Sequence, residues 1–158
     1  MTVAYRETTL GKIGIAEENG AITHVCFADC EKLPAAAKEG KSPLLTEAFR
    51  QLKAFLDGKI KTFSLPLAPV GTPFQMRVWK VLETIPYGEA WSYKDVATRA
   101  GNPKAMRAVG MANNRNPIAI IIPCHRVIGA DGTLVGYGGG LDRKVKLLEL
   151  EGYQMLDA

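Results

Sequence analysis

The hydrophobic pattern in the first part of the chain is typical of strands at first and then of a helix. Two segments with a strand-like pattern, at 8–16 and 21–27, flank the dipeptide Asn19-Gly20, and Ile13 and Ile15 supply a face of period two. This dipeptide tolerates the positive φ of a tight turn, so the pattern predicts a β-hairpin. Ser42-Pro43 then opens a predicted helix, whose apolar residues recur at helical spacing until Gly58. These elements predict a small α/β unit.

The segment after this helix predicts a domain boundary. Residues 63–70 are extended in character, but they include Pro66 and Pro69. Proline removes backbone donors from a ladder, which favours an edge strand that runs into a linker. We therefore expect an α/β (α+β) protein of two domains, with residues 1–70 in the first and residues 71–158 in the second.

The second domain opens with three predicted helices. Thr72-Pro73-Phe74-Gln75 is a capping box that starts a helix ending before Pro86. Ser92 caps a short helix that Gly101 ends, and Asn102-Pro103 opens a third helix that runs to about residue 113. Two short helices joined by a turn that contains glycine are typical of a helix-turn-helix.

The rest of the chain predicts a strand, a hairpin and a final helix. The strand is the apolar run 118–122, and the hairpin pairs 126–128 with 133–135 around Asp131-Gly132. A hairpin that follows a helix-turn-helix is a wing. The final helix covers residues 142–150 and ends at Gly152.

Charge and cysteine content narrow the function. The chain has 158 residues and a net charge of +4, and the span 94–126 holds six basic residues against one acidic residue. A polyanion is the natural partner of such a span, but a solvated face carries the same pattern, so the span indicates DNA only together with a geometric reason. Three cysteines argue against a disulfide framework and suit a reducing compartment. With neither a long apolar run nor a signal-peptide pattern at the N-terminus, we expect a cytoplasmic protein that has no contact with membranes.

The most informative motif is Pro123-Cys124-His125-Arg126-Val127, which places a thiol beside an imidazole directly after an apolar run. A free cysteine has a pKa of about 8.5, and a neighbouring histidine or cation is the usual way to increase its thiolate fraction. The motif therefore predicts a nucleophilic cysteine on a tight turn.

A nucleophilic cysteine built on a winged helix-turn-helix resembles the O6-alkylguanine-DNA alkyltransferases, also called methylated-DNA-protein-cysteine methyltransferases. The resemblance covers most of residues 72–152. It implies a ribonuclease-H-like N-terminal domain and a winged helix-turn-helix C-terminal domain. The matching motifs are Thr72-Pro73-Phe74-Gln75, Ile85-Pro86-Tyr87-Gly88-Glu89, Ser92-Tyr93, Gly101-Asn102-Pro103, Arg107-Ala108-Val109-Gly110, Asn116-Pro117, Pro123 to Val127, Gly136 to Gly140 and Glu151-Gly152.

The resemblance implies a suicidal DNA repair reaction without a cofactor. Cys124 would attack the alkyl carbon on guanine O6, and also on thymine O4, and would keep the alkyl group as a thioether. His125 would act as its base through a bound water, and Glu151 would orient His125. Asn116 would brace the turn around the active site.

The same resemblance implies how the protein holds double-stranded DNA. A base inside a duplex cannot reach a buried thiol, so the nucleotide must be flipped out. Arg107 would fill the gap, and Tyr93 would rotate the adjacent phosphate. The recognition helix would enter the minor groove, where small residues allow close approach and Met106 departs from the family's pattern. The remaining candidate residues are Ala105, Ala108, Gly110, Arg115 and Arg126 for DNA contacts, and Tyr137 and Gly138 for the guanine pocket.

Two alternative functions stay open at this point. One is a lesion-binding or regulatory DNA protein without catalysis, and the other is a cysteine hydrolase that turns over repeatedly. His24, Cys26 and Cys30 could be metal ligands, but a fourth ligand is not evident, so we expect no metal site. We also expect the protein to act as a monomer.

Overall fold

The computed structural model describes residues 1–28, 33–134, 137 and 139–154. It divides the chain into two compact units. The first unit holds Met1–Val70 together with Pro117–Ile121, and the second holds Gly71–Asn116 together with the residues from Ile122 onward. A short segment in the second half of the sequence thus packs with the first unit.

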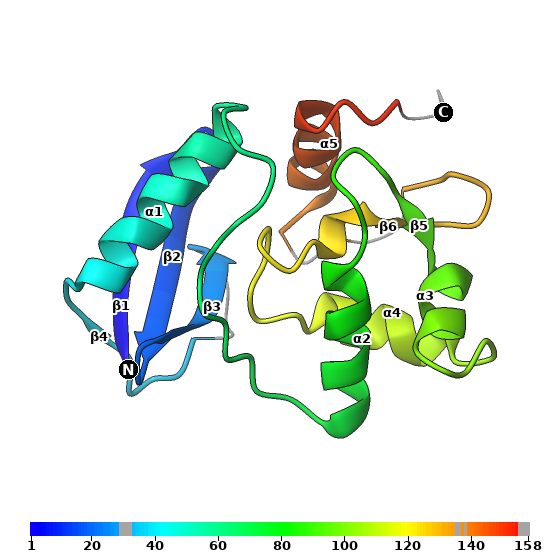
Figure 1. Cartoon of the computed structure of the whole chain (residues 1–158), viewed down its shortest axis with the longest axis horizontal. Helices are drawn as coiled ribbons and strands as arrows, with labels where there is room; N and C mark the ends of the chain where they lie inside the picture. Colours follow the sequence, from blue (N-terminus) through cyan, green and yellow to red (C-terminus); the bar gives the residue numbers. More distant parts are fainter. Residues whose placement is uncertain (29–32, 135–136, 138, 155–158) are drawn as a thin grey trace. The chain divides into compact units, whose positions relative to one another are not determined.

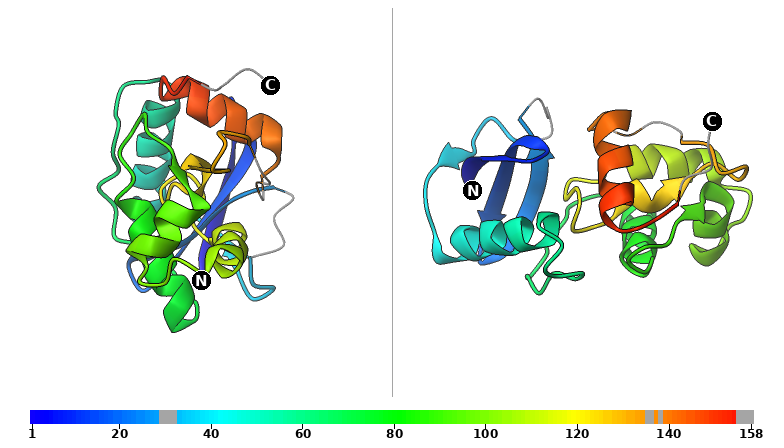
Figure 2. Two further views of the ribbon diagram at one scale, coloured as in Figure 1. Left: turned by 90° about the vertical axis from the view of Figure 1, so that its right-hand side faces the viewer. Right: turned by 90° about the horizontal axis from the view of Figure 1, so that it is seen from above.

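In its described part, the first unit is a four-stranded sheet with one helix (Figure 1). Its strands follow the order β3-β2-β1-β4, antiparallel except for the parallel pair β1 and β4. The helix α1, Pro43–Leu56, covers one face of this sheet (Figure 2). The strands are β1 (Thr2–Thr8), β2 (Gly11–Glu18), β3 (Ala21–Phe27) and β4 (Lys38–Glu39).

The predicted hairpin is confirmed, because β2 and β3 pair antiparallel around Asn19 and Gly20, whose φ angles are 53° and 79°. The strand β1 was not predicted. Only Val3 is buried among its residues, so β1 carries little of the alternation that identifies a half-buried strand. Its place in the sheet comes from pairing with β2 along its whole length.

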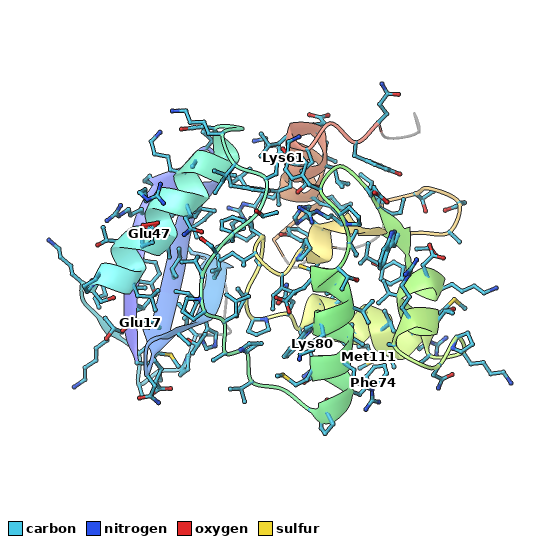
Figure 3. All side chains as sticks on the ribbon, in the orientation of Figure 1. Glu17, Glu47, Lys61, Phe74, Lys80 and Met111 are labelled. Atoms are coloured by element: carbon cyan, nitrogen blue, oxygen red, sulfur yellow. The ribbon has the colours of Figure 1, made fainter. Side chains whose placement is uncertain are left out.

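The helix α1 begins as its sequence predicts. The hydroxyl of Ser42 accepts a hydrogen bond from the backbone N–H of Leu45, and proline follows the cap. The helix turns its apolar face to the sheet, while Glu47, labelled in Figure 3, pairs with Arg50 in solvent. The edge strand predicted at 63–70 is corrected, because this segment makes only an isolated parallel bridge between Leu67 and Ile22. Its prolines cannot donate backbone hydrogen bonds to a ladder.

The second unit is built from four α-helices and two very short strands in its described part. The capping box predicted at Thr72 and the helix cap predicted at Ser92 are both formed, and Asp95 completes a capping box at Ser92 as well. Trp79 joins α2 to α4 by donating its indole N–H to the Ala112 carbonyl at 2.9 Å. The elements are α2 (Pro73–Glu83), β5 (Trp91–Ser92), α3 (Tyr93–Arg99), α4 (Met106–Asn114), a 3₁₀ turn η1 (Cys124–Arg126), β6 (Val127–Ile128) and α5 (Leu141–Leu150).

The helix α4 starts later than predicted, at Met106 instead of Pro103. The Asn102 side chain accepts a hydrogen bond from the Lys104 N–H at 3.1 Å, and the Ala105 N–H bonds to the Asn102 carbonyl at 3.0 Å. Asparagine thus closes a local turn here instead of capping a helix.

The predicted strand at 118–122 is wrong. Only Ile118 makes a β-bridge, to Val25, and the backbone then turns. Ile120 has φ of 71°, a conformation that is incompatible with a strand and uncommon for a β-branched residue. The apolar residues of this run instead belong to the hydrophobic core, since Ile118, Ile120 and Ile122 are all fully buried.

The predicted wing hairpin is also corrected. The short strand β6 pairs in parallel with β5, and Thr133 and Leu134 are not in a strand. A turn closes by a hydrogen bond from the Gly129 N–H to the Thr133 carbonyl at 2.8 Å. Val135 lies outside the described residues.

The described helices include none that is both long enough and apolar enough to cross a bilayer.

Candidate active site

Cys124 lies at the start of η1 and is buried, with 5% of its surface exposed. Two asparagine side chains hold the backbone around it. Asn116 donates its Nδ2 to the Ile122 carbonyl at 2.8 Å, and Asn113 donates its Nδ2 to the Cys124 carbonyl at 3.3 Å. Both asparagines are buried, so the turn that presents the thiol is anchored on both sides of Pro123.

The next two residues of the turn meet one carboxylate from the end of α5. His125 Nε2 lies 2.7 Å from Glu151 Oε2. Arg126 donates to both oxygens of Glu151, through Nε at 2.8 Å and Nη2 at 2.9 Å, and its Nη1 donates to the Ile85 carbonyl at 2.7 Å. All three side chains are buried, so the carboxylate is held in one geometry.

The network determines which nitrogen of His125 carries its proton. Burial opposes ionisation of Glu151, but the hydrogen bonds from His125 and Arg126 outweigh it and lower the pKa of Glu151. Burial lowers the pKa of His125 below its ordinary value of 6.5, and Glu151 offsets this only in part. The imidazole is therefore neutral at pH 7. An ionised carboxylate only accepts, so Nε2 holds the proton and Nδ1 is left as an acceptor.

His125 Nδ1 is buried and has no hydrogen-bond partner among the described residues. A buried nitrogen with a free lone pair is rare unless it serves a function. A neutral imidazole with one nitrogen bound to a carboxylate and the other available can accept a proton from a nearby nucleophile.

A buried lysine lies near the thiol. Lys144 of α5 is fully buried and donates its Nζ to the Val127 carbonyl at 2.6 Å. Burial lowers its pKa from 10.5 to about 8, while the charge of Cys124 acts in the opposite direction. Lys144 thus lies within electrostatic reach of the thiol and favours its ionised form.

Two tyrosines complete the surroundings of Cys124. Burial and the charge of Cys124 raise the pKa of Tyr93. Burial also raises the pKa of Tyr137, and the charge of Cys124 acts in the same direction. Both phenols therefore stay protonated and can donate hydrogen bonds. The other predicted pocket residue, Gly138, lies outside the described residues.

The predicted DNA-contact residues fall into two groups. Arg107, Ala108 and Arg115 are exposed on or just after α4, while Ala105 and Gly110 are partly exposed. Arg126 does not belong with them, because its guanidinium is buried against Glu151. The expectation that Arg126 contacts DNA is corrected, because this guanidinium belongs to the buried network that Glu151 forms with His125.

Only two of the three candidate metal ligands lie in the described part of the chain. His24 and Cys26 lie on β3 in the first unit, and Cys30 lies outside the described residues. Among those that are described, no three histidine, cysteine or acidic side chains gather as metal ligands would.

Sequence reasoning missed two residues of this site, Lys144 and Asn113, although each carries a signal. Lys144 shares a helical face with Leu147, Leu148 and Glu151, at spacings of three, four and seven. Asn113 lies four residues after Val109 and so falls on the buried face of α4. A polar residue on an apolar face indicates a buried polar contact.

Both units of the chain match known protein families. Residues 73–153 match the family model described as 6-O-methylguanine DNA methyltransferase, DNA binding domain, and residues 1–69 match its ribonuclease-like domain. The chain is 53% identical over 148 residues to a methylated-DNA–protein-cysteine methyltransferase of Methanosarcina barkeri, which covers 92% of this chain and 93% of that one. A constitutive Bacillus subtilis relative of the same name is 47% identical over 151 residues, covering 92% of each chain.

A solved structure agrees with these matches. Mycobacterium tuberculosis OGT, crystallised in complex with DNA, superposes with a TM-score of 0.89 at 43% identity, covering 96% of this chain and 92% of that one. The expected fold class, an N-terminal ribonuclease-like sheet domain followed by a C-terminal DNA-binding domain, is thereby confirmed. The two matched domains and these relatives together show that the chain belongs to the methylated-DNA–protein-cysteine methyltransferase family.

Proposed function

We propose that Cys124 is the residue that takes the alkyl group in this chain. The family activity is transfer of a methyl group from O6-methylguanine in DNA to a cysteine of the protein, which is a direct repair of the DNA. The observation that carries the assignment is the buried Cys124, which adjoins a neutral His125 whose Nε2 is tied to Glu151.

The proposed step is an in-line displacement at carbon. The sulfur of Cys124 forms a bond to the alkyl carbon, the bond between that carbon and guanine O6 breaks, and its electron pair stays with the guanine, which then takes up a proton. The product on the protein is a thioether, which water does not hydrolyse. Each chain therefore acts once.

The proton of Cys124 is proposed to pass through one water molecule to His125 Nδ1. That nitrogen is the free acceptor of the network, and Glu151 stabilises the imidazolium that forms. Lys144 favours the thiolate by its charge, and Asn116 and Asn113 fix the turn. Tyr137 is proposed to line the base pocket, and O4-alkylthymine is proposed as a second substrate.

Flipping of the damaged nucleotide follows from the burial of Cys124. With 5% of its surface exposed, the thiol cannot meet a base that is stacked in a duplex. We assign Arg107 of α4 to fill the space that the flipped nucleotide leaves, and Tyr93 at the start of α3 to turn the adjacent phosphate. Ala105, Ala108 and Gly110 let α4 approach the minor groove closely, and Arg115 adds a phosphate contact.

The protein is proposed to work as a monomer in the cytoplasm on double-stranded DNA. Cys26 and Cys124 are not joined in a disulfide, and a reducing compartment preserves such thiols.

The direct test is mass spectrometry of the protein after it is mixed with excess duplex that carries one O6-methylguanine. We expect a mass increase of one methyl group per chain that does not rise further, mapped to the peptide containing Cys124. Binding of the duplex without any mass change would instead support the lesion-binding alternative. Repeated release of a product would support a hydrolase.

The pH dependence of transfer tests the state of His125. Because the pKa of His125 lies below 6.5, its neutral, proton-accepting form persists in mildly acidic solution. We expect the single-turnover rate to fall, on the acidic side, with a midpoint below pH 6.5. The control is His24→Gln, which replaces the second of the two histidines and should leave this midpoint unchanged. An acidic midpoint above 6.5 that persists in His24→Gln would contradict the assignment.

A further inference from the structure

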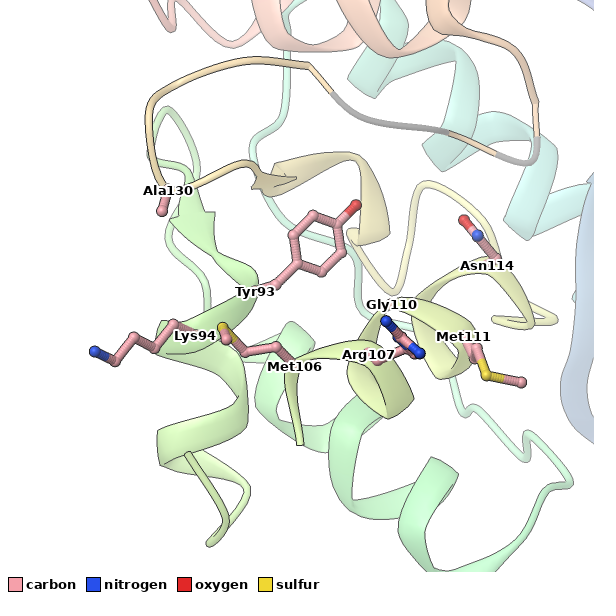
Figure 4. Close-up of a pocket in the computed structure, with 8 residues that line it drawn as sticks. All are labelled: Tyr93, Lys94, Met106, Arg107, Gly110, Met111, Asn114 and Ala130. Carbon is pink, nitrogen blue, oxygen red and sulfur yellow. The ribbon is translucent and has the colours of Figure 1, made fainter. Parts of the chain in front are cut away.

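Two methionines on α4 are exposed at positions where the solvent-facing side of a helix usually carries polar residues. The large apolar side chains that are exposed in the described chain are Val70, Met106 (46%), Met111 (57%) and Leu141. Two of these four lie on one helix of nine residues. Both methionines line the same surface cavity of about 500 Å³, together with Tyr93 and Arg107 (Figure 4).

The two methionines lie at opposite edges of one helix face. Successive residues of an α-helix are rotated by about 100°, so Met106 and Met111 are separated by about 140° around α4, and Gly110 and Arg107 fall between them. Figure 4 shows the same arrangement, with the two thioethers on either side of Arg107. The opposite face of α4 is the buried one and carries Val109 and Ala112.

Packing within the protein does not explain why residue 110 is a glycine, Gly110. It lies inside α4, where glycine costs about 1 kcal/mol relative to alanine. A Cβ built at this position would meet only the ring of Tyr93, at 3.7 Å, which is an ordinary contact. The missing side chain therefore indicates close approach of something outside the chain, between the two methionines.

The charges around this cavity indicate what approaches. Its lining includes Lys94 and Arg107 and no acidic residue. Contact with phosphates would explain the two cations. It would not explain the two exposed thioethers, because a purely ionic contact would leave them in water. The minor groove offers phosphates at its edges and apolar sugar and base surface within it, and methionine is among the side chains that enter between base steps there.

From these observations we propose that Met106 and Met111 are apolar DNA-contact residues, which flank Arg107 in the minor groove and loosen the stacking of the base pairs beside the flipped nucleotide. This proposal rests on the proposed function, because it takes α4 as the helix that meets DNA. It assigns a role in duplex opening to side chains outside the reacting group.

The test distinguishes apolar from ionic contacts by the salt dependence of DNA binding. Met106→Gln/Met111→Gln keeps side-chain length and helix propensity and removes the apolar character. Binding to a fluorescein-labelled duplex is measured by anisotropy at several KCl concentrations. We expect about tenfold weaker binding at every concentration with an unchanged salt slope. Lys94→Gln should instead reduce the slope of log K against log [salt] by about 0.9, because one phosphate contact is lost.

A matched control and a second readout keep the result specific. Met76→Gln, on α2 and outside the cavity, should bind as the unaltered protein does. A duplex with 2-aminopurine beside the O6-methylguanine should brighten on binding as the base unstacks, and less so with the double variant. Met106→Ala/Met111→Ala should repeat both effects, and circular dichroism should show α-helix content unchanged.

Three results would overturn the proposal. Unchanged affinity in both double variants would show that the methionines do not contact DNA. A reduced salt slope would show that they act by displacing cations. The third result would be a dimer of the unaltered protein in sedimentation, with the double variant monomeric. That result would assign this face to contact with a second copy of the chain. The methyl transferred per chain is measured in parallel, and its absence in the unaltered protein would mark failure of the proposed function instead.

Discussion

Replacing Cys124 with alanine is expected to leave a protein that binds alkylated duplex DNA but never gains mass from it. The change removes the nucleophile and leaves the exposed residues of α4 as they are. Methyl transfer should fall from one group per chain to none detectable, while the affinity for the duplex should stay within about twofold. Mass spectrometry and anisotropy on the same samples measure both quantities.

The matched control for this experiment is Cys26→Ala. Cys26 is the other free and buried cysteine of the described residues, and it lies on β3 in the first unit. This variant should accept one methyl group as the unaltered protein does. A methyl group found on Cys26 or on any other residue of Cys124→Ala would show that Cys124 is not the sole acceptor.

Replacing Glu151 with glutamine is expected to cause the second largest loss, because it affects stability and reactivity together. Arg126 would stay buried without its carboxylate, and breaking a buried pair in this way costs about 3 kcal/mol or more. His125 would lose the charge that stabilises its protonated form, so transfer should slow by about 10²-fold or more. Denaturant unfolding and single-turnover kinetics measure the two effects.

The pH dependence of this loss gives a check on its cause. The folded protein holds the pKa of Glu151 below 4.5, so its contribution to stability is present above pH 4.5 and is lost as pH falls through the folded value. The stability gap between Glu151→Gln and the unaltered protein should therefore shrink in acid. Glu149→Gln, on an exposed position of the same helix, is the control and should change neither quantity. An equal loss in both variants would contradict the network.

Local signals in the sequence determine much of the fold. The caps at Ser42, Thr72 and Ser92 and the turn at Asn19-Gly20 all form as their sequences predict, since each depends on hydrogen bonds or φ angles within a few residues. The same locality explains one error. Asn102 satisfies its own turn, so the signal for a helix start did not specify where α4 begins.

Elements that depend on distant partners could not be predicted in this way. The strand β1 exists because β2 lies beside it, and β6 pairs with β5, a segment more than thirty residues earlier. The apolar run at 118–122 resembles a strand, yet the positive φ of Ile120 turns it, and Ile118 and Ile120 are buried in the first unit. An apolar run specifies burial but does not specify backbone conformation.

The sequence by itself determined the chemistry of this protein, and the tertiary structure decided how that chemistry is arranged. Cys124 and His125 are adjacent, so their motif is visible in the chain, and the family motifs identified Glu151 by resemblance. Only the fold brings Glu151 to 2.7 Å from His125, buries Arg126 against it and places Lys144 near the thiol. The physical reason is that burial and charge pairing set pKa values, and both depend on residues that are distant in sequence.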